Sequence, residues 1–342
     1  MGKLDSILKV ENLSVSFSDG KESTKILKNV SFSVPKGKML AIVGESGCGK
    51  SVTVHSIMQL LPRNGHIDSG KVLYNNGENE VDLVPMKKYG KEMRAMRGRN
   101  IGMIFQDPMA SLNPTHQVGK QVMENLVQHY KMPKKEAMES VIELFRRLGI
   151  PDPEQRVKEY PHQFSGGMRQ RVMIAISMIC NPDLLIADEP TTALDVTIQA
   201  QIMDLMKDLQ VKHNKSIILI THNMGLVAEV ADYVAVMYMG RIVEYGTVKD
   251  ILNSPSHPYT KALLKSVPVM GLDKNQKLAT IRGATPNPKD YVKGCEFAGR
   301  CDFAMESCLT RDIPDTNLTA SHQVKCLLFE ESFVDSKEVI AK

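Results

Sequence analysis

The stretch MLAIVGESGCGKS, Met39–Ser51, decides the fold. Its apolar beginning, MLAIV, is a continuous run that is typical of a strand buried on both faces of a sheet. The remainder, Gly44–Ser51, matches the phosphate-loop pattern G-x-x-x-x-G-K-[ST] completely, and a helical stretch, SVTVHSIMQLL, follows. A strand, a glycine-rich loop and a helix in this order predict a nucleotide-binding site at the start of the helix.

The composition of this loop suits phosphate binding. Glycines let the backbone curl so that successive N–H groups point at phosphate oxygens, and the helix start adds partial positive charge. Lys50 can reach the β- and γ-phosphates, and the Ser51 hydroxyl can ligate Mg²⁺. Cys48 is interpreted as a tolerated small residue rather than a catalytic thiol. The residues predicted to bind the nucleotide here are Gly44, Glu45, Ser46, Gly47, Cys48, Gly49, Lys50, Ser51 and Val52.

Buried strands alternate with helical patterns along the chain. LLIADE (184–189) and SIILITH (216–222) have the character of buried strands, and VTIQAQIMDLMKDLQVKH (196–213) between them has that of a helix. This alternation indicates an α/β fold with a largely parallel sheet. Near the N-terminus, ILKVENLSVSF and KILKNVSFSVP also indicate strands. YVAVMYMGRIVEYG (233–246) predicts a hairpin that turns near Gly240.

The bulk composition is that of an ordinary soluble protein, with 42% hydrophobic residues, 24% charged residues and a net charge of +4. This mild charge does not indicate nucleic-acid binding, and no run of 18 apolar residues could span a bilayer. No secretory signal is evident at the start. Prolines recur after about Gly246, which predicts a small, loop-rich appendage over 255–330 and a flexible tail over 331–342.

The strand LLIADE ends in two carboxylates. Asp188 is predicted to hold Mg²⁺, directly or through water, and Glu189 to polarise an attacking water near the γ-phosphate. Such a pair could instead cap a helix, but the phosphate loop favours the catalytic interpretation. Together the two motifs predict a Mg²⁺-dependent nucleotide triphosphatase.

FSGGMRQR (164–171) points to the class of triphosphatase. Ser165 precedes two glycines and a long helical stretch, MRQRVMIAISMI. A Ser-Gly-Gly helix start makes a second anion-binding terminus, separate from the phosphate loop. One phosphate loop and one such terminus in a chain suggest that two chains, head to tail, each supply half of two ATP sites.

With these motifs the sequence resembles the ATP-binding-cassette (ABC) ATPases from about residue 7 to residue 250. The resemblance implies a P-loop cassette over 1–254: a RecA-like parallel-sheet core, an antiparallel β subdomain and a helical subdomain at about 107–180. It also implies ATP and Mg²⁺ as cofactors. The family's commonest signature is Leu-Ser-Gly-Gly-Gln, whereas this chain has Phe164 and Met168 at the two ends of an intact Ser-Gly-Gly.

The resemblance assigns roles to residues in the chain's own site. Phe17 matches the aromatic residue that stacks on adenine. Gln106, in MIFQDP, matches the glutamine that links Mg²⁺ and the attacking water to the transmembrane partner. His222, in ITHN, matches the histidine that contacts the γ-phosphate, so the catalytic set is Glu189, His222 and Gln106.

The resemblance also implies contacts with a second ATPase subunit. Ser165, Gly166 and Gly167 match the signature that contacts the ATP of the opposite subunit. Asp195, at the end of TALD, matches the aspartate of the dimer contact. The resemblance favours a different chain as this partner.

The C-terminal region narrows the class. SPSHPYTKALL (254–264) and GCEFAGRCDFAMESC (294–308) resemble the extension of oligopeptide and dipeptide importer ATPases. This implies an ATP-hydrolysing subunit, peripheral at the cytoplasmic face of the cell membrane, that energises peptide import. Its partners would be a second ATPase, two permeases docked near 107–126 and, indirectly, an extracytoplasmic peptide-binding protein.

Two alternatives to peptide import stay open. Relatives of the same subfamily import nickel or another small solute. A member of a different class would be a soluble cassette ATPase acting on nucleic acid or ribosomes. A single cassette without a long heptad run disfavours that class, so we expect no nucleic-acid partner.

Four of the six cysteines lie late in the chain, as Cys295-x5-Cys301-x6-Cys308-x17-Cys326. Disulfides are disfavoured in a cytosolic ATPase. Four thiolates suit tetrahedral Zn²⁺, but zinc sites usually show tighter C-x₂₋₄-C pairs. A [4Fe–4S] cluster tolerates looser spacing, and the extension that this chain resembles can carry one. We expect the cluster, with zinc or unliganded thiols as alternatives, and we expect His322 at the surface.

Overall fold

The computed structural model describes residues 5–20, 22–107, 111–192, 194–266, 281–287, 289 and 293–330, so the tail expected over 331–342 lies outside the described residues. The chain divides into two compact units. Unit 1 comprises 1–8, 34–39 and 74–220, and unit 2 comprises 9–33, 40–73 and 221–342. Among the described residues, no helix combines the length and the apolar character that a membrane crossing requires.

Unit 1 is built on three parallel strands. They are β6 (Ile101–Ile104), β7 (Leu184–Asp188) and β8 (Ser216–Ile220), with β7 between the other two. Every residue of the three strands is buried, which explains why each reads as a continuous apolar run instead of an alternating one. The parallel strands predicted from LLIADE and SIILITH are therefore confirmed.

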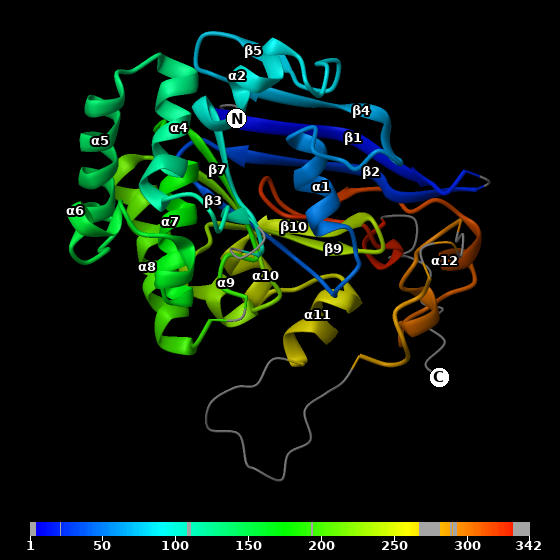
Figure 1. Cartoon of the computed structure of the whole chain (residues 1–342). Coiled ribbons are helices and arrows are strands. Elements are labelled where there is room, and N and C mark those ends of the chain that lie inside the picture. The colour runs from blue at the N-terminus through cyan, green and yellow to red at the C-terminus, as the bar shows by residue number, and fades with distance from the viewer. Residues whose placement is uncertain are drawn as a thin grey trace. The chain divides into compact units, whose positions relative to one another are not determined.

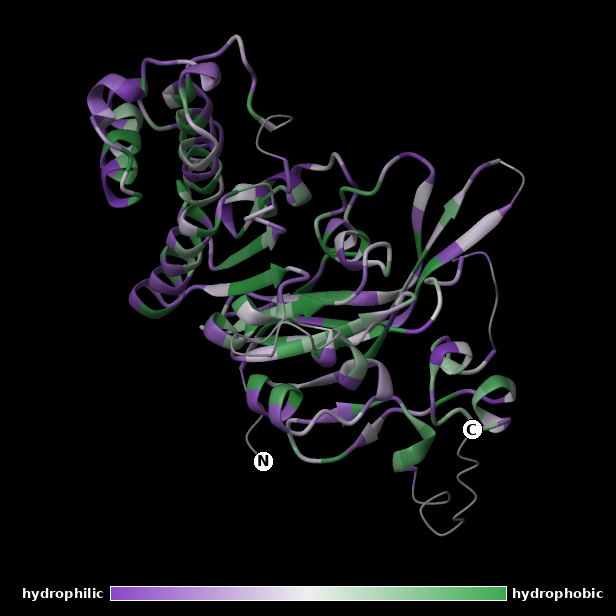
Figure 2. Ribbon diagram, turned by 90° about the horizontal axis from the view of Figure 1, so that it is seen from below, coloured by the Kyte–Doolittle hydropathy of each residue, from purple (hydrophilic) through white to green (hydrophobic). Residues whose placement is uncertain are grey.

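Helices of unit 1 pack against one another through apolar stripes. α4 buries Val118, Val122 and Leu126, and α5 buries Ala137, Val141 and Phe145, at the spacing of one helix face. Figure 1 shows α4, α5 and α7 side by side, and Figure 2 shows that helices of the chain carry both polar and apolar residues. The helices of this unit are α2 (Lys91–Arg99), α4 (Val118–Tyr130), α5 (Lys134–Arg147), α6 (Pro153–Arg156), η1 (Pro161–Gln163), α7 (Gly166–Met178) and α8 (Val196–His213).

Unit 2 contains a mixed sheet. β3 (Met39–Val43) runs parallel to β9 (Tyr233–Tyr238), which forms an antiparallel hairpin with β10 (Arg241–Thr247). Gly240 makes the turn at a φ of +80°, and a Cβ there would lie 1.9 Å from the carbonyl oxygen of Ile26. The hairpin predicted near Gly240 is confirmed, and only glycine fits its turn.

Several further elements complete the described part of the chain. β2 (Ser23–Pro35), β1 (Ser6–Ser18) and β4 (Gly65–Asn75) follow one another in a second sheet. The short strands are β5 (Glu80–Asp82) in unit 1 and β11 (Thr316–Asn317) and β12 (Gln323–Val324) in unit 2. The helices of unit 2 are α1 (Lys50–Ile57), α9 (Met224–Val230), α10 (Val248–Asn253), α11 (Pro258–Lys265), η2 (Ala298–Arg300), α12 (Ser307–Thr310) and η3 (Leu327–Phe329).

The C-terminal region shares a core with the mixed sheet of unit 2. The Phe297 ring lies 5.3 Å from that of Tyr238 on β9 and 5.4 Å from that of Tyr259 on α11, measured between centroids. β12 also pairs with β10, with Val324 opposite Glu244. The loop-rich appendage is therefore anchored both by aromatic packing and by backbone hydrogen bonds.

His322 is buried, so the expectation that it lies at the surface is wrong. It is 4% exposed, and its Nε2 lies 2.8 Å from Oε1 of Glu244. The Glu244 carboxylate also accepts hydrogen bonds from the backbone N–H groups of Ser256 and His257. These partners satisfy a buried carboxylate, which explains why a polar histidine is retained inside.

Candidate functional site

The phosphate loop of unit 2 joins β3 to α1. Gly44, Gly47 and Gly49 all have positive φ, at +153°, +78° and +108°. A Cβ on Gly44 would lie 2.1 Å from the carbonyl oxygen of Met237, and one on Gly49 would lie 2.8 Å from Cδ2 of Leu27. The tight curl predicted from GESGCGKS therefore requires glycine for backbone angle and for space.

Lys50 opens α1 and folds back over the loop. Its side-chain Nζ donates hydrogen bonds to the carbonyl oxygens of Gly44, at 2.9 Å, and Glu45, at 3.0 Å. The residue is only 6% exposed. Its positive charge is thus held inside the curl, at the end of the helix where anions bind.

Cys48 is part of the wall of the loop. It is buried, and its carbonyl oxygen accepts a hydrogen bond from the N–H of Gly240. Burial raises the pKa of its thiol, even though Lys50 lies nearby. A neutral, buried thiol agrees with the interpretation of Cys48 as a small structural residue and not a nucleophile.

Phe17 and His222 are the other predicted nucleotide contacts in unit 2. Phe17 lies on β1 and is half-buried, with its ring packed over Gly65, where a Cβ would approach Cζ of the ring to 3.1 Å. His222 is exposed and precedes α9, whose N-terminus is capped by Asn223. Their contacts with adenine and with the γ-phosphate stay predictions.

Unit 1 brings together residues predicted from separate motifs. Asp188 ends β7 and is 3% exposed, and Glu189 follows in the left-handed region, at a φ of +46°. Gln106 Nε2 donates to Oε2 of Glu189 at 2.9 Å, and the Thr192 hydroxyl donates to the same oxygen at 3.0 Å. Two donors therefore fix the carboxylate of the predicted catalytic glutamate.

The signature residues lie at a tight crossing of two helices in unit 1. Ser165 caps α7, because its Oγ accepts from the N–H of Met168 at 3.3 Å. Asp195 caps α8 in the same way, accepting from the N–H of Ile198 at 3.0 Å. A Cβ on Gly167 would lie 2.7 Å from Cγ2 of Ile198, so this glycine is needed for packing. Gly166 has more room, and Ala193 of TALD lies outside the described residues.

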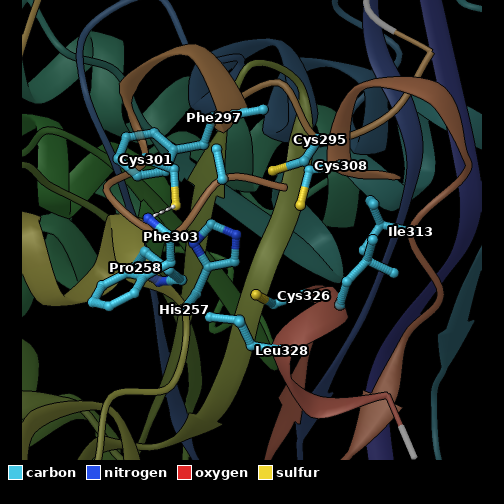
Figure 3. A pocket seen from close by; sticks show the side chains of 13 residues that line it. His257, Pro258, Cys295, Phe297, Cys301, Phe303, Cys308, Ile313, Cys326 and Leu328 are labelled. Atoms are coloured by element: carbon cyan, nitrogen blue, oxygen red, sulfur yellow. Dashed lines mark hydrogen bonds between the residues drawn. The ribbon is translucent and has the colours of Figure 1, made fainter. Parts of the chain in front are cut away.

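The four late cysteines line one cavity in unit 2, as Figure 3 shows. Burial raises the pKa of Cys295 to about 12 and that of Cys326 to about 11, and it also raises that of Cys301. Within the described ranges, no three or more His, Cys, Asp or Glu side chains are grouped closely enough to hold a single metal ion. The iron–sulfur cluster and the zinc site therefore stay predictions.

Comparison with known proteins identifies the family. Residues 27–192 match the model "ABC transporter", and 243–308 match "Oligopeptide/dipeptide transporter, C-terminal region". The chain is 51% identical over 330 residues to the dipeptide transport ATP-binding protein DppD of Bacillus subtilis, covering 96% of both chains. It belongs to the ABC transporter family. The oligopeptide transport ATP-binding protein OppD of the same organism is 50% identical over 329 residues, which cover 96% of this chain and 90% of the relative.

Solved ABC cassettes share the fold. A dimeric post-hydrolysis structure of the cassette MJ0796 with ADP and phosphate has a TM-score of 0.62 and 26% identity, covering 70% of this chain and 98% of that one. CbiO1 of Clostridium perfringens has a TM-score of 0.60 and 30% identity, covering 73% and 92%. The expected α/β cassette fold is confirmed, and this ABC protein is an ATPase.

The sequence patterns did not identify two residues that hold the phosphate loop of this ABC protein. The Tyr259 hydroxyl accepts from the N–H of Glu45 at 2.9 Å, and the Arg300 guanidinium grips the Glu45 carboxylate. Tyr259 belongs to the SPSHPYTKALL stretch, so its motif was a usable signal. Nothing in the sequence marks Arg300, which lies 255 positions from Glu45.

Proposed function

We propose that this chain is the ATP-hydrolysing subunit of an importer of di- or oligopeptides. The observation that carries the proposal is the match of residues 243–308 to the C-terminal region of oligopeptide/dipeptide transporters, on the same chain as the cassette match over 27–192. Its partners are a second ATPase subunit, two membrane permeases and, through them, a peptide-binding protein. We propose that the chain lies at the cytoplasmic face of the cell membrane as a peripheral subunit.

We assign the chemistry of hydrolysis to residues of the predicted motifs. The N–H groups of the phosphate loop and Lys50 bind the phosphates. The Ser51 hydroxyl, the Gln106 amide oxygen and the Asp188 carboxylate supply the oxygen ligands that Mg²⁺ prefers. Bound Mg²⁺ neutralises charge on the phosphates. Glu189, held by Gln106, orients or deprotonates the attacking water.

Three further assignments concern recognition. Phe17 stacks on adenine, and His222 contacts the γ-phosphate. The α7 start, with Ser165, Gly166 and Gly167, binds the ATP of the partner ATPase, and Asp195 contacts that partner. The start of α7 supports this role, because the first N–H groups of a helix have no partner within the helix and suit an anion. We infer that the pair is head to tail and formed with a different chain.

The division of the chain into regions is a further part of the proposal. We propose a cassette over 1–254, including a helical subdomain at about 107–180, and a peptide-transporter extension over 255–330. The segment 107–126 is the proposed docking region for the permeases, and 108–110 within it lie outside the described residues. α4 begins inside this segment, at Val118.

The cysteine cavity fits an iron–sulfur cluster by its donor chemistry. Cys295, Cys301, Cys308 and Cys326 all line the cavity and supply four thiols. His257 lines the same cavity, and its Nδ1 accepts from the N–H of Tyr259. Its Nε2 therefore carries the proton, is buried and lacks a partner among the described residues. A [4Fe–4S] cluster would accept that hydrogen bond and cross-link a region with little core of its own; zinc is the alternative.

Reconstitution tests the proposed function. The chain is combined with its candidate permeases and partner ATPase in vesicles, and ATP-dependent uptake of labelled di- and oligopeptides is compared with uptake of Ni²⁺. Peptide uptake that requires Glu189 supports the proposal. Uptake of Ni²⁺ without uptake of peptides would show that the cargo is the metal ion. Failure to co-purify with multi-spanning permeases would contradict the transporter assignment. Iron, sulfide and zinc analysis of the same sample identifies the metal.

A further inference from the structure

The segment Cys295–Cys301 in unit 2 connects the cysteine cavity to the phosphate loop. Cys295 and Cys301, at the two ends of the segment, both line the cavity. Between them, Glu296 contacts β2, Phe297 contacts β9 and Arg300 contacts the phosphate loop. The segment is therefore held by an ion pair, by aromatic packing and by two parallel hydrogen bonds from the Arg300 guanidinium to the Glu45 carboxylate (the fork).

Glu296 fixes the start of the segment. Its carboxylate is buried, and Oε1 accepts from Nζ of Lys28 at 3.1 Å and from Nε of Arg241 at 2.8 Å. The two cations come from β2 and from β10. Glu296 has little freedom to move, because a shift away from Lys28 or Arg241 would leave that cation without its carboxylate partner.

Phe297 fixes the middle of the segment. Its ring packs edge-on against Tyr238 of β9 and Tyr259 of α11. The Tyr259 hydroxyl in turn accepts from the backbone N–H of Glu45. The aromatic cluster therefore reaches the backbone of the phosphate loop through one hydrogen bond.

Arg300 fixes the end of the segment directly to the loop. Its Nη1 donates to Oε2 of Glu45 at 2.7 Å, and its Nη2 donates to Oε1 at 3.0 Å. Its Nε donates to the carbonyl oxygen of Arg282 at 2.7 Å, and its side chain is 7% exposed. A two-bond fork with little exposure is specific in orientation as well as in charge.

Glu45 passes this constraint to the lysine of the loop. Its carbonyl oxygen accepts from Nζ of Lys50 at 3.0 Å, while its carboxylate is held by Arg300 and its N–H by Tyr259. Cys301 is the residue bonded to Arg300. Cys301 is thus joined to Arg300 by a peptide bond, and Arg300 to Glu45 by two hydrogen bonds. Glu45 in turn accepts a hydrogen bond from the Lys50 ammonium, which is proposed to bind phosphate.

We propose that Arg300 is a positioning residue for the phosphate loop, through which the state of the cysteine cavity changes the affinity for ATP. The part that concerns the cavity rests on the metal site proposed above. A group bound by Cys301 fixes the peptide that carries Arg300, and the fork transmits its position to Glu45. By linkage, ATP then changes the affinity of the cavity for its group by the same factor.

The first test compares two arginines of the same region in the full chain. Arg300→Gln removes the fork, and the dissociation constant for ATP is measured by calorimetry together with the metal content. We expect the constant to rise roughly 2- to 30-fold, the range found for residues that couple two sites. Arg282→Gln is the matched control, because that side chain is exposed and only its backbone carbonyl contacts Arg300. Equal ATP affinity in the wild type and in Arg300→Gln would overturn the proposal.

A second variant guards against a simple folding defect. Glu45→Gln alters the opposite end of the fork and keeps its size, and we expect it to weaken ATP binding without changing the metal content. Combined with Arg300→Gln it should add little further loss, because both changes remove one interaction. Fully additive losses would show that the two side chains act independently, contrary to the proposal.

The final test separates the coupling from the metal site itself. Cys301→Ser should weaken ATP binding in the wild type and have little further effect in the Arg300→Gln background. An equal loss of ATP affinity in both backgrounds would overturn coupling through Arg300. Unchanged ATP affinity of a metal-depleted Cys301→Ser variant in the wild-type background would overturn it as well. A wild-type chain purified without iron or zinc would refute the metal site, while the effect of Arg300→Gln on ATP binding would still test the loop-positioning role.

Discussion

Nε2 of Gln106 lies 2.9 Å from Oε2 of Glu189, although 83 positions separate the two residues in sequence. The Thr192 hydroxyl contacts the same oxygen at 3.0 Å. The carboxylate that would activate water is therefore held in one orientation by two donors. Pre-orientation of this kind lowers the cost of reaching the transition state, because the group need not be reorganised during the reaction.

Glu189→Gln should separate ATP binding from ATP hydrolysis. The amide keeps the size of the side chain but cannot accept a proton, so we expect steady-state hydrolysis to fall at least about 100-fold. ATP affinity should stay within about threefold, since the phosphate loop is untouched. Phosphate release and calorimetry on the same preparation check both values. Near-normal turnover would contradict the assignment of Glu189.

Gln106→Ala should slow hydrolysis less than loss of Glu189 does. It removes one of the two donors on the Glu189 carboxylate and leaves Thr192 in place. We expect kcat to fall about tenfold at an almost unchanged KM for ATP, because the lost interaction orients the catalytic group and does not bind substrate. Thr192→Val is the companion variant, and the double variant should lose more than either. A rise in KM alone would assign Gln106 to binding.

Glu244→Gln should destabilise unit 2. The buried carboxylate accepts from two backbone N–H groups and meets His322, whereas an amide would turn its own NH₂ toward one of these donors. We expect the free energy of unfolding to fall by about 2–4 kcal/mol. Glu229→Gln, at an exposed position of α9, is the control and should be nearly neutral. Denaturant titration with equal m-values measures both; equal stability of the two variants would contradict the buried role.

Tyr245→Phe should change the alkaline pH dependence of stability. Burial raises the pKa of Tyr245 from 10.0 to about 12, and its hydroxyl donates to the carbonyl oxygen of Ser33. Between pH 10 and 12 the unfolded tyrosine ionises while the folded one stays neutral, so stability falls as pH rises, by up to about 1.4 kcal/mol per unit for this group. The variant should show a shallower fall. Tyr89→Phe, at an exposed position, should keep the wild-type slope.

Local sequence patterns predicted the elements that are decided locally. MLAIV, LLIADE and SIILITH are strands because an all-apolar run fits a sheet covered on both faces, and the helix at Val196–His213 begins and ends where its pattern does. The turn at Gly240 followed from its glycine. These features depend on neighbours within a few residues, so the sequence displays them directly.

Long-range pairs could not be predicted in the same way. The burial of His322 depends on Glu244, which is 78 positions away, and a histidine looks the same in sequence whether or not such a partner exists. The fork between Arg300 and Glu45 spans 255 positions and carries no motif. The pairing of Gln106 with Glu189 was within reach only because both residues belong to an ordered family pattern.

The hydrogen bond from the N–H of Glu45 to the Tyr259 hydroxyl also limits how the chain can be divided. A cut near residue 254 would remove Tyr259, Phe297 and Arg300 and leave the Tyr238 ring uncovered. The region after residue 254 therefore helps to hold the phosphate loop, and removing it would take away two side chains that fix Glu45.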